Sequence, residues 1–173
     1  METKKIFHWF WAWQDEREES WLSEMAAQGW HLQTPGAFCD HTFTRGEPRQ
    51  VTYRLDFFFD SRNKAHYLQI FQDAGWEHVG EAGTWQYFRK PVVDGEAPEI
   101  YTDTTSKITK YQRILMLLVI LLPIFIFIPQ RLNQAGGWFF EAAALLAFVL
   151  NLFYLYAMVK LIGRLSQLKK SQH

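Results

Sequence analysis

The spacing of apolar residues changes along the chain and predicts strands and amphipathic helices first, then two long apolar helices. Aromatic residues alternate with their neighbours over residues 6–13 and 50–59, a pattern typical of strands. Over residues 14–28 and 60–74, apolar residues recur every three or four positions, which indicates helices that pack on one side. Four further short strands are predicted after these helices, at residues 30–38, 40–44, 76–79 and 84–89.

Both predicted helices end at a Gly-Trp step, at Gly29-Trp30 and again 46 positions later at Gly75-Trp76. Glycine is typical of helix ends because it adopts the left-handed conformation without steric cost. The same shift superimposes the two aromatic strands, although strands this rich in aromatic residues also match by chance. We therefore predict an α+β fold of duplicated β-α-β-β units, about residues 5–46 and 51–91. These units would form one largely antiparallel sheet with two helices on one face, and a pseudo-twofold axis would relate Trp30 to Trp76.

Two apolar stretches fill the last third of the chain. Residues 114–128 contain no charged residue, and residues 138–162 continue the apolar composition after a short polar turn. A helix needs about 20 residues to cross a membrane. A buried hairpin of a soluble protein is the alternative, but it would show a polar face, and the first stretch has none. The predicted organisation is a soluble α+β domain (1–91), a linker (92–110), a transmembrane helical hairpin (111–165) and a cytoplasmic tail (166–173).

Basic residues flank the apolar stretches mainly on the side of the chain termini. They are Lys107, Lys110 and Arg113 before the first stretch, and Lys160, Arg164, Lys169 and Lys170 at the end of the second. The connecting turn contains only Arg131. Because positive charges beside membrane spans stay in the cytoplasm, we predict a membrane protein with both termini cytoplasmic. The lipid bilayer is then its first partner.

Three residues of the second apolar stretch are predicted to pack helices together. Ala143 and Ala147 form a small-xxx-small pair that permits close approach of a neighbouring helix. Asn151 lies nearer the middle of the membrane, where an unpaired amide is costly, so we expect it to bond another helix.

Composition narrows the function classes. The chain has 18 Lys and Arg against 18 Asp and Glu, so no basic surface for direct nucleic-acid binding is expected. The single cysteine, Cys39, excludes an internal disulfide. Cys39 and His41 are spaced to share a strand face, but a zinc site needs three or four ligands, so we predict no metal and no cofactor. No nucleophile motif or phosphate-binding loop is present, and we expect no enzymatic activity.

The sheet face away from the helices carries the residues best suited to a ligand. A carboxylate and a guanidinium lie there among aromatic rings, which suits a small cationic or amphipathic molecule. The predicted ligand-binding residues are His8, Phe10, Arg54, Asp56 and Phe58. The alternative is that Arg54 and Asp56 pair on a solvated face, or that this face docks on a protein or membrane.

Five motifs in order resemble one known family. They are residues 21–32 (WLSEMAAQGWHL), 42–48 (TFTRGEP), 53–56 (YRLD), 74–76 (AGW) and 87–91 (YFRKP). Over roughly residues 5–91 the chain resembles the bacterial domain of unknown function 2812. Members often carry a C-terminal pair of membrane spans, and many are encoded beside PadR-like transcription regulators. The resemblance therefore implies a regulatory or envelope-stress association, without an activity or site residues. The repeated unit is also similar in topology to GyrI-like small-molecule-binding modules, an analogy of fold alone.

Together with the resemblance to a bacterial family, the two apolar stretches predict a bacterial inner-membrane protein. Two function hypotheses follow. The first is a membrane-tethered cytoplasmic sensing or protein-interaction module with a regulatory role, whose partner is a small amphipathic ligand or a protein such as a PadR-like regulator. The second is a small accessory subunit of a membrane transporter or complex that acts through its transmembrane hairpin. Asn151→Ala and Ala147→Leu separate the two, because loss of a co-purifying membrane partner favours the second.

Overall fold

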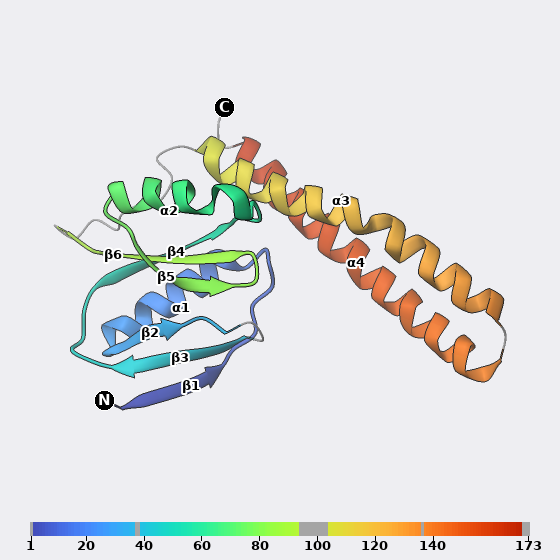
Figure 1. Cartoon of the computed structure of the whole chain (residues 1–173), viewed down its shortest axis with the longest axis horizontal. Coiled ribbons are helices and arrows are strands. Elements are labelled where there is room, and N and C mark those ends of the chain that lie inside the picture. The colour runs from blue at the N-terminus through green and yellow to red at the C-terminus, as the bar shows by residue number, and fades with distance from the viewer. Residues whose placement is uncertain (1, 37–38, 94–103, 136, 171–173) are drawn as a thin grey trace. The chain divides into compact units, whose positions relative to one another are not determined.

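The structure is a computed structural model, and it describes residues 2–36, 39–93, 104–135 and 137–170. The chain divides into two compact units, Met1–Thr102 and Asp103–His173, and each is described by itself. The first unit mixes strands and helices, and the second is a pair of long helices (Figure 1). The predicted α+β class with a C-terminal helical pair is therefore confirmed.

The first half of the α+β unit is a strand, a helix and two strands. These elements are β1 (Thr3–Phe7), α1 (Asp15–Ala27), β2 (Trp30–Thr34) and β3 (Asp40–Arg45). The strands form an antiparallel sheet of order β1-β3-β2. Leu22 and Met25 of α1 share a buried core with Leu32 and Phe43 of this sheet, because these apolar residues fall on one side of the helix.

The second half repeats this arrangement. Its elements are β4 (Val51–Phe57), a short 3-10 turn η1 (Ser61–Asn63), α2 (Lys64–Asp73), β5 (Glu77–Ala82) and β6 (Trp85–Pro91). The strand order is β4-β6-β5, again antiparallel. The first, second and third strands of each half thus occupy equivalent places, and the two halves share one β-α-β-β topology.

The two halves form two three-stranded sheets, so the prediction of one continuous sheet is wrong. At the outer edge of β2, side chains of the second half take the place of a neighbouring strand. The Leu32 N–H donates to the Tyr53 hydroxyl at 3.3 Å, and the Leu32 carbonyl accepts from Arg89 Nη1 at 3.5 Å. A strand that joined β2 here would need the same backbone groups.

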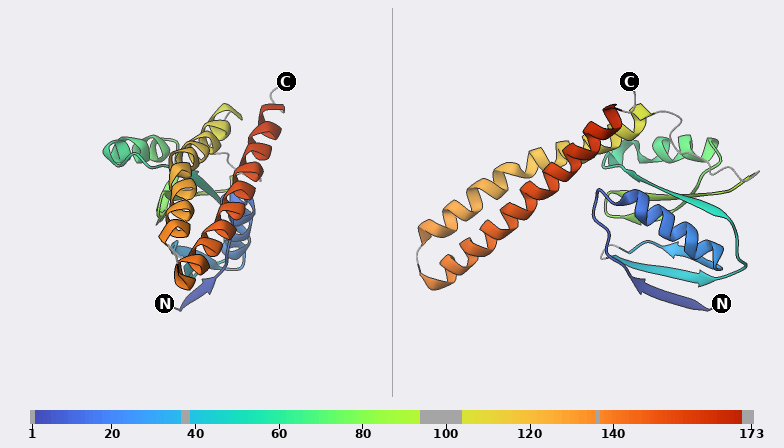
Figure 2. Two further views of the ribbon diagram at one scale, coloured as in Figure 1. Left: turned by 90° about the vertical axis from the view of Figure 1, so that its right-hand side faces the viewer. Right: turned by 180° about the vertical axis from the view of Figure 1, so that it is seen from behind.

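The two helices lie on opposite faces of the second sheet, so the prediction of two helices on one face is also wrong. Tyr87 and Phe88 are neighbours on β6 and point to opposite sides. Tyr87 lies in the core that includes α1, whereas Phe88 packs with Phe71 of α2. Figures 1 and 2 show α1 between the two sheets and α2 on the far side of the second. The single axis expected to relate Trp30 and Trp76 within one sheet is therefore absent from this arrangement.

The Gly-Trp steps nevertheless have the same local geometry. Gly29 and Gly75 adopt left-handed φ values of 83° and 80°. The residue before each glycine follows directly on the helix, and its carbonyl accepts a hydrogen bond from a cationic side chain. Arg45 Nη1 donates to the Gln28 carbonyl at 2.8 Å, and Lys90 Nζ donates to the Ala74 carbonyl at 2.8 Å. The same cations lie over the rings of Trp30 and Trp76, at 5.0 and 5.8 Å from the ring centroids. The repeated motif is thus a helix end closed by a glycine and a cation.

The strand predicted over residues 6–13 is shorter than expected. β1 ends at Phe7, which pairs with Asp40 at the start of β3. One further backbone bond follows, from the His8 N–H to the Cys39 carbonyl at 2.9 Å. The strand pairing ends there, at the left-handed φ of 62° of Cys39. The chain then turns into α1, with the Gln14 N–H donating to the Trp11 carbonyl at 2.7 Å. The strand predicted over 30–38 likewise ends at Thr34, and its positions 37 and 38 lie outside the described residues.

The second unit is a hairpin of α3 (Thr104–Ala135) and α4 (Trp138–Lys170) (Figure 2). Both helices are long and apolar enough to cross a membrane, over Lys107–Arg131 and Trp138–Lys170. Most of their large apolar side chains are exposed, as at Phe127 and Phe148, which is compatible with membrane association. Of the predicted linker, residues 94–103 lie outside the described chain and the part from Thr104 onward is helical.

Candidate functional site

A half-open cavity of about 210 Å³ lies in the first unit, where the segment after β1 meets α1, β3 and the β5–β6 hairpin. Aromatic and acidic side chains dominate its lining. The lining residues are His8, Trp9, Phe10, Trp11, Ala12, Asp15, Glu18, Gly36, Cys39, His41, Leu55, Ala82, Trp85 and Tyr87.

Glu18, His41 and Tyr87 form a hydrogen-bonded cluster at this cavity. The Tyr87 hydroxyl donates to Glu18 Oε1 at 2.6 Å, and His41 Nε2 lies 3.0 Å from the same oxygen. All three residues are buried: Glu18 exposes 8% of its surface, His41 2% and Tyr87 5%. Burial, together with the neighbouring Glu18 carboxylate, raises the pKa of the Tyr87 hydroxyl above its ordinary value. Tyr87 therefore keeps its proton and remains a hydrogen-bond donor to Glu18.

The cluster leaves one carboxylate oxygen open. An ionised carboxylate only accepts hydrogen bonds, so His41 Nε2 must carry the hydrogen that it shares with Glu18 Oε1. His41 Nδ1 is buried and has no hydrogen-bond partner among the residues that the structure describes. Both hydrogen bonds of Glu18 end on Oε1, and Oε2 accepts none from the part of the chain that the structure describes. Since Glu18 lines the cavity, the site offers an anionic acceptor to which no described residue donates.

The segment between β1 and α1 forms an aromatic wall of the cavity. The rings of Trp9 and Trp11 meet edge to face at 5.2 Å. His8 and Phe10 stack at 4.3 Å, and both contact Trp21 of α1, at 4.8 and 5.6 Å between ring centroids. Aromatic contacts of this kind hold an irregular segment in place where strand pairing is missing. Part of the segment predicted to form a strand, residues 8–12, thus lines this cavity instead.

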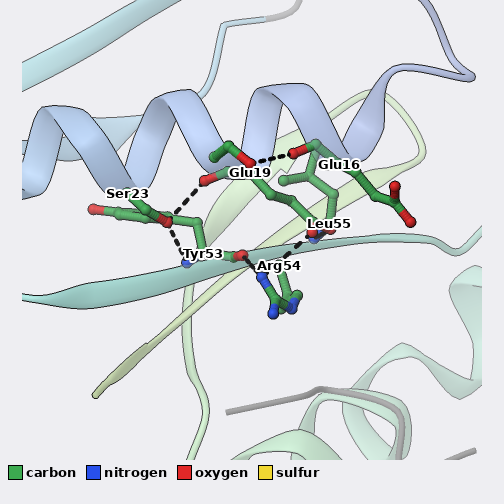
Figure 3. Close-up of polar contacts among 7 residues, drawn as sticks. Glu16, Glu19, Ser23, Tyr53, Arg54 and Leu55 are labelled. Atoms are coloured by element: carbon green, nitrogen blue, oxygen red, sulfur yellow. Dashed lines mark hydrogen bonds and ion pairs between the residues drawn. The ribbon is translucent and has the colours of Figure 1, made fainter. Parts of the chain in front are cut away.

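Helix α1 is anchored to the edge of β4 by two of its side chains (Figure 3). Glu19 Oε1 accepts from the Leu55 N–H at 2.8 Å, and Ser23 Oγ accepts from the Tyr53 N–H at 3.2 Å. These N–H groups alternate with the ones that face β6, so α1 completes the edge that a further strand would cover. The anchor fixes the part of the helix that carries Glu18.

We expect Glu19→Ala to lower the free energy of unfolding by about 1–2 kcal/mol, because the buried Leu55 N–H loses its acceptor. Glu19→Gln keeps an oxygen at the same place and should change stability by less than about 0.5 kcal/mol. Urea unfolding of the detergent-solubilised chain, followed by tryptophan fluorescence, measures both. Equal losses for the two variants would mean that the charge, and not the acceptor oxygen, holds the strand edge.

The structure separates the five residues predicted to bind a ligand. His8 and Phe10 line the cavity. Asp56 and Phe58 contact α2 instead: the Tyr67 hydroxyl donates to Asp56 Oδ2 at 2.8 Å, and the Phe58 and Tyr67 rings stack at 3.9 Å. Arg54 Nη1 lies 3.5 Å from Glu19 Oε2. The face expected to be open is therefore covered by α2 around Asp56 and Phe58, and the five residues form no single site.

The central residues of the cavity were not predicted, although the sequence contains a signal for one of them. Glu18 precedes Leu22 and Met25 by one and two helical turns, so it continues the buried stripe of α1. A carboxylate on an apolar stripe is unusual unless it has partners. His41 and Tyr87 come from distant strands, and only the fold brings them to Glu18. The described residues contain no group of three or more His, Cys, Asp or Glu side chains placed to hold a metal ion.

The three predicted packing residues share one side of α4. Ala143 and Ala147 are half-buried there. Asn151 Nδ2 donates to the Phe125 carbonyl of α3 at 2.7 Å and to the Ala147 carbonyl at 3.1 Å. Proline at position 129, inside α3, has no N–H, so the carbonyl four residues earlier loses its helical partner. Asn151 supplies the missing donor to that carbonyl.

The fold and the cavity define a class of protein: an α+β domain with an acidic aromatic cavity, joined to two helices able to cross a membrane. The chain belongs to the family described as Protein of unknown function (DUF2812), which it matches over residues 14–123. The match extends beyond the five motifs into α3, so the family pattern includes part of the first apolar helix. No curated protein and no solved structure matches the chain, and the topological likeness to GyrI-like modules is not confirmed.

Proposed function

We propose that this protein is a membrane-tethered module whose N-terminal domain senses a small ligand or binds a protein partner, in a regulatory role. The observation that carries the proposal is the cavity in which Glu18 Oε2 has no donor among the described residues. An ionised carboxylate that lines a cavity accepts hydrogen bonds from a molecule bound there. Catalysis is not part of the proposal, since the cavity combines its acceptor with no recognised nucleophile motif.

The tether is the helical hairpin. We propose that α3 and α4 span the bacterial inner membrane with both termini in the cytoplasm, as the basic residues at the terminal ends of both helices favour. This places the cavity where it meets cytoplasmic ligands and regulators, a PadR-like protein among them.

The proposal is tested by filling the cavity. Ala82 lines it, and Ala82→Phe should remove a molecule or protein that co-purifies with the full chain after mild membrane solubilisation. Native mass spectrometry detects a bound small molecule, and proteomics detects a protein. Ala65→Phe, on the exposed surface of α2, is the matched control and should leave the complex intact. If the unaltered chain carries neither a ligand nor a partner, the sensing proposal fails.

The role as an accessory subunit of a membrane complex stays a second prediction with less support. A bond from the Asn151 amide to a helix of another protein would have supported it. Asn151 instead donates to Phe125 and Ala147 of its own hairpin, so its donors are used within the chain.

A further inference from the structure

We infer that the cavity binds a protonated amine or amidinium carried on a single apolar ring, with Glu18 as its counter-ion. This inference rests on the proposed function and names the ligand class of the same site. It follows from the charge of the lining, its open acceptor, its aromatic wall and its volume.

The charge of the lining selects a cation. Among the described residues that line the cavity, Asp15 and Glu18 are carboxylates and none is a lysine or an arginine. Glu18 exposes only 10% of its side chain, so its charge is poorly solvated. An anionic ligand would add repulsion to that burial, whereas a cation compensates it.

The open acceptor selects a cation that can donate. Glu18 Oε1 already accepts from Tyr87 and faces His41 Nε2, while Oε2 accepts nothing from the described residues. An ammonium or amidinium N–H gives Oε2 a charge-assisted hydrogen bond, which is among the strongest in proteins. A quaternary ammonium has the same charge but no N–H, so it should bind less tightly.

The wall and the volume select a single ring. Trp9, Trp11 and Trp85 line the cavity, and tryptophan faces attract organic cations best among the side chains. A cavity of about 150 Å³ holds one benzene molecule. The cavity volume of about 210 Å³ therefore suits one ring with a short cationic group.

Isothermal titration of the full chain in mild detergent tests the inference with four probes of one size. These are benzylammonium, benzyltrimethylammonium, benzyl alcohol and benzoate. We expect benzylammonium to bind tightest and benzoate not to bind. Glu18→Gln should weaken benzylammonium about 10–100-fold, the range of a charge-assisted hydrogen bond. Glu19→Gln is the matched control. Glu19 follows Glu18 on α1, but its carboxylate accepts from the Leu55 N–H, so the affinity for benzylammonium should not change.

The possible failures are distinguishable. If benzyl alcohol binds as well as benzylammonium and Glu18→Gln has no effect, the cavity is a ligand site but the inference of a cation is wrong. If no probe binds while the purified chain still carries a molecule or partner lost in Ala82→Phe, the inference fails and the proposed function stands. If neither is seen, both fail. Should Glu18→Gln not fold, Trp85→Leu replaces it, and it should weaken benzylammonium more than benzyl alcohol.

Discussion

Gly29→Ala should lower the free energy of unfolding by about 2–4 kcal/mol, whereas Gly75→Ala should cost about 1 kcal/mol. Both glycines end a helix with nearly the same left-handed φ, 83° and 80°. The strain of placing alanine in that conformation should therefore lower the stability of both variants by a similar amount. The surroundings differ. A Cβ at position 29 would lie 2.7 Å from the Gly46 carbonyl oxygen, and one at position 75 would meet only the end of the Lys90 side chain, at 3.4 Å.

The Gly46 oxygen has little freedom to move away. The Gly46 N–H donates to the Gly29 carbonyl at 2.9 Å, and the Arg49 N–H donates to the Ala26 carbonyl at 3.1 Å. The turn after β3 is therefore tied to the end of α1 by backbone hydrogen bonds on both sides of the contact. A lysine side chain, by contrast, changes rotamer at small cost.

Tryptophan fluorescence during urea unfolding measures the difference, because seven of the eight tryptophans lie before residue 90. Gly83→Ala is a control, since Gly83 also has a left-handed φ but nothing lies within 4 Å of its added Cβ. It should behave like Gly75→Ala. Equal losses for Gly29→Ala and Gly75→Ala would show that the Gly46 turn yields, and that the two helix ends are energetically alike.

The repeat could be predicted from the sequence because its signals are local. A helix stripe, a glycine that accepts a left-handed φ and a following strand each depend on residues within a few positions of one another. The closing cations, Arg45 and Lys90, are less local, but they come from the strands that pair with the segments after each helix. The same β-α-β-β topology in both halves is the outcome of these local rules.

The number of sheets could not be predicted in this way. Alternation along a strand tells which side chains share a face, but it does not tell which strand lies beside which edge. Here the edge of β4 is completed by Glu19 and Ser23, and the edge of β2 by Tyr53 and Arg89. Polar side chains from other elements thus end both sheets after three strands, and the spacing of apolar residues does not predict such contacts.

The candidate site was missed for a related reason. Acidic residues are common at the start of a helix because its N-terminus attracts anions, so the position of Glu18 near the start of α1 does not by itself indicate burial. Glu18 instead faces inward, because the second sheet packs over α1 with Tyr87 toward it. The burial of this carboxylate depends on the arrangement of the two sheets, and that arrangement could not be predicted from the pattern of residues along the chain.

In the hairpin, we expect Asn151→Leu to cost about 2 kcal/mol in the natural chain and less than about 0.5 kcal/mol when Pro129 is also replaced by alanine. The leucine has the size of asparagine but donates no hydrogen bond, so the Phe125 carbonyl loses its donor. In an apolar environment such a carbonyl has no water to replace the lost partner. Pro129→Ala restores a backbone N–H four residues after Phe125, and the helix itself then supplies the hydrogen bond.

Pro123→Ala provides the matched control for this cycle. Pro123 is also inside α3, but its missing N–H leaves the Val119 carbonyl, and not that of Phe125, without a helical partner. Near Val119, the Tyr154 hydroxyl of α4 donates to the Leu118 carbonyl. Asn151→Leu should therefore still cost about 2 kcal/mol in the Pro123→Ala background. Unfolding of the full chain by dodecyl sulfate, followed by far-ultraviolet circular dichroism, measures each corner of the cycle. An equal cost of Asn151→Leu with and without Pro129 would mean that the amide stabilises the hairpin by packing, and that its position opposite the proline has no energetic role.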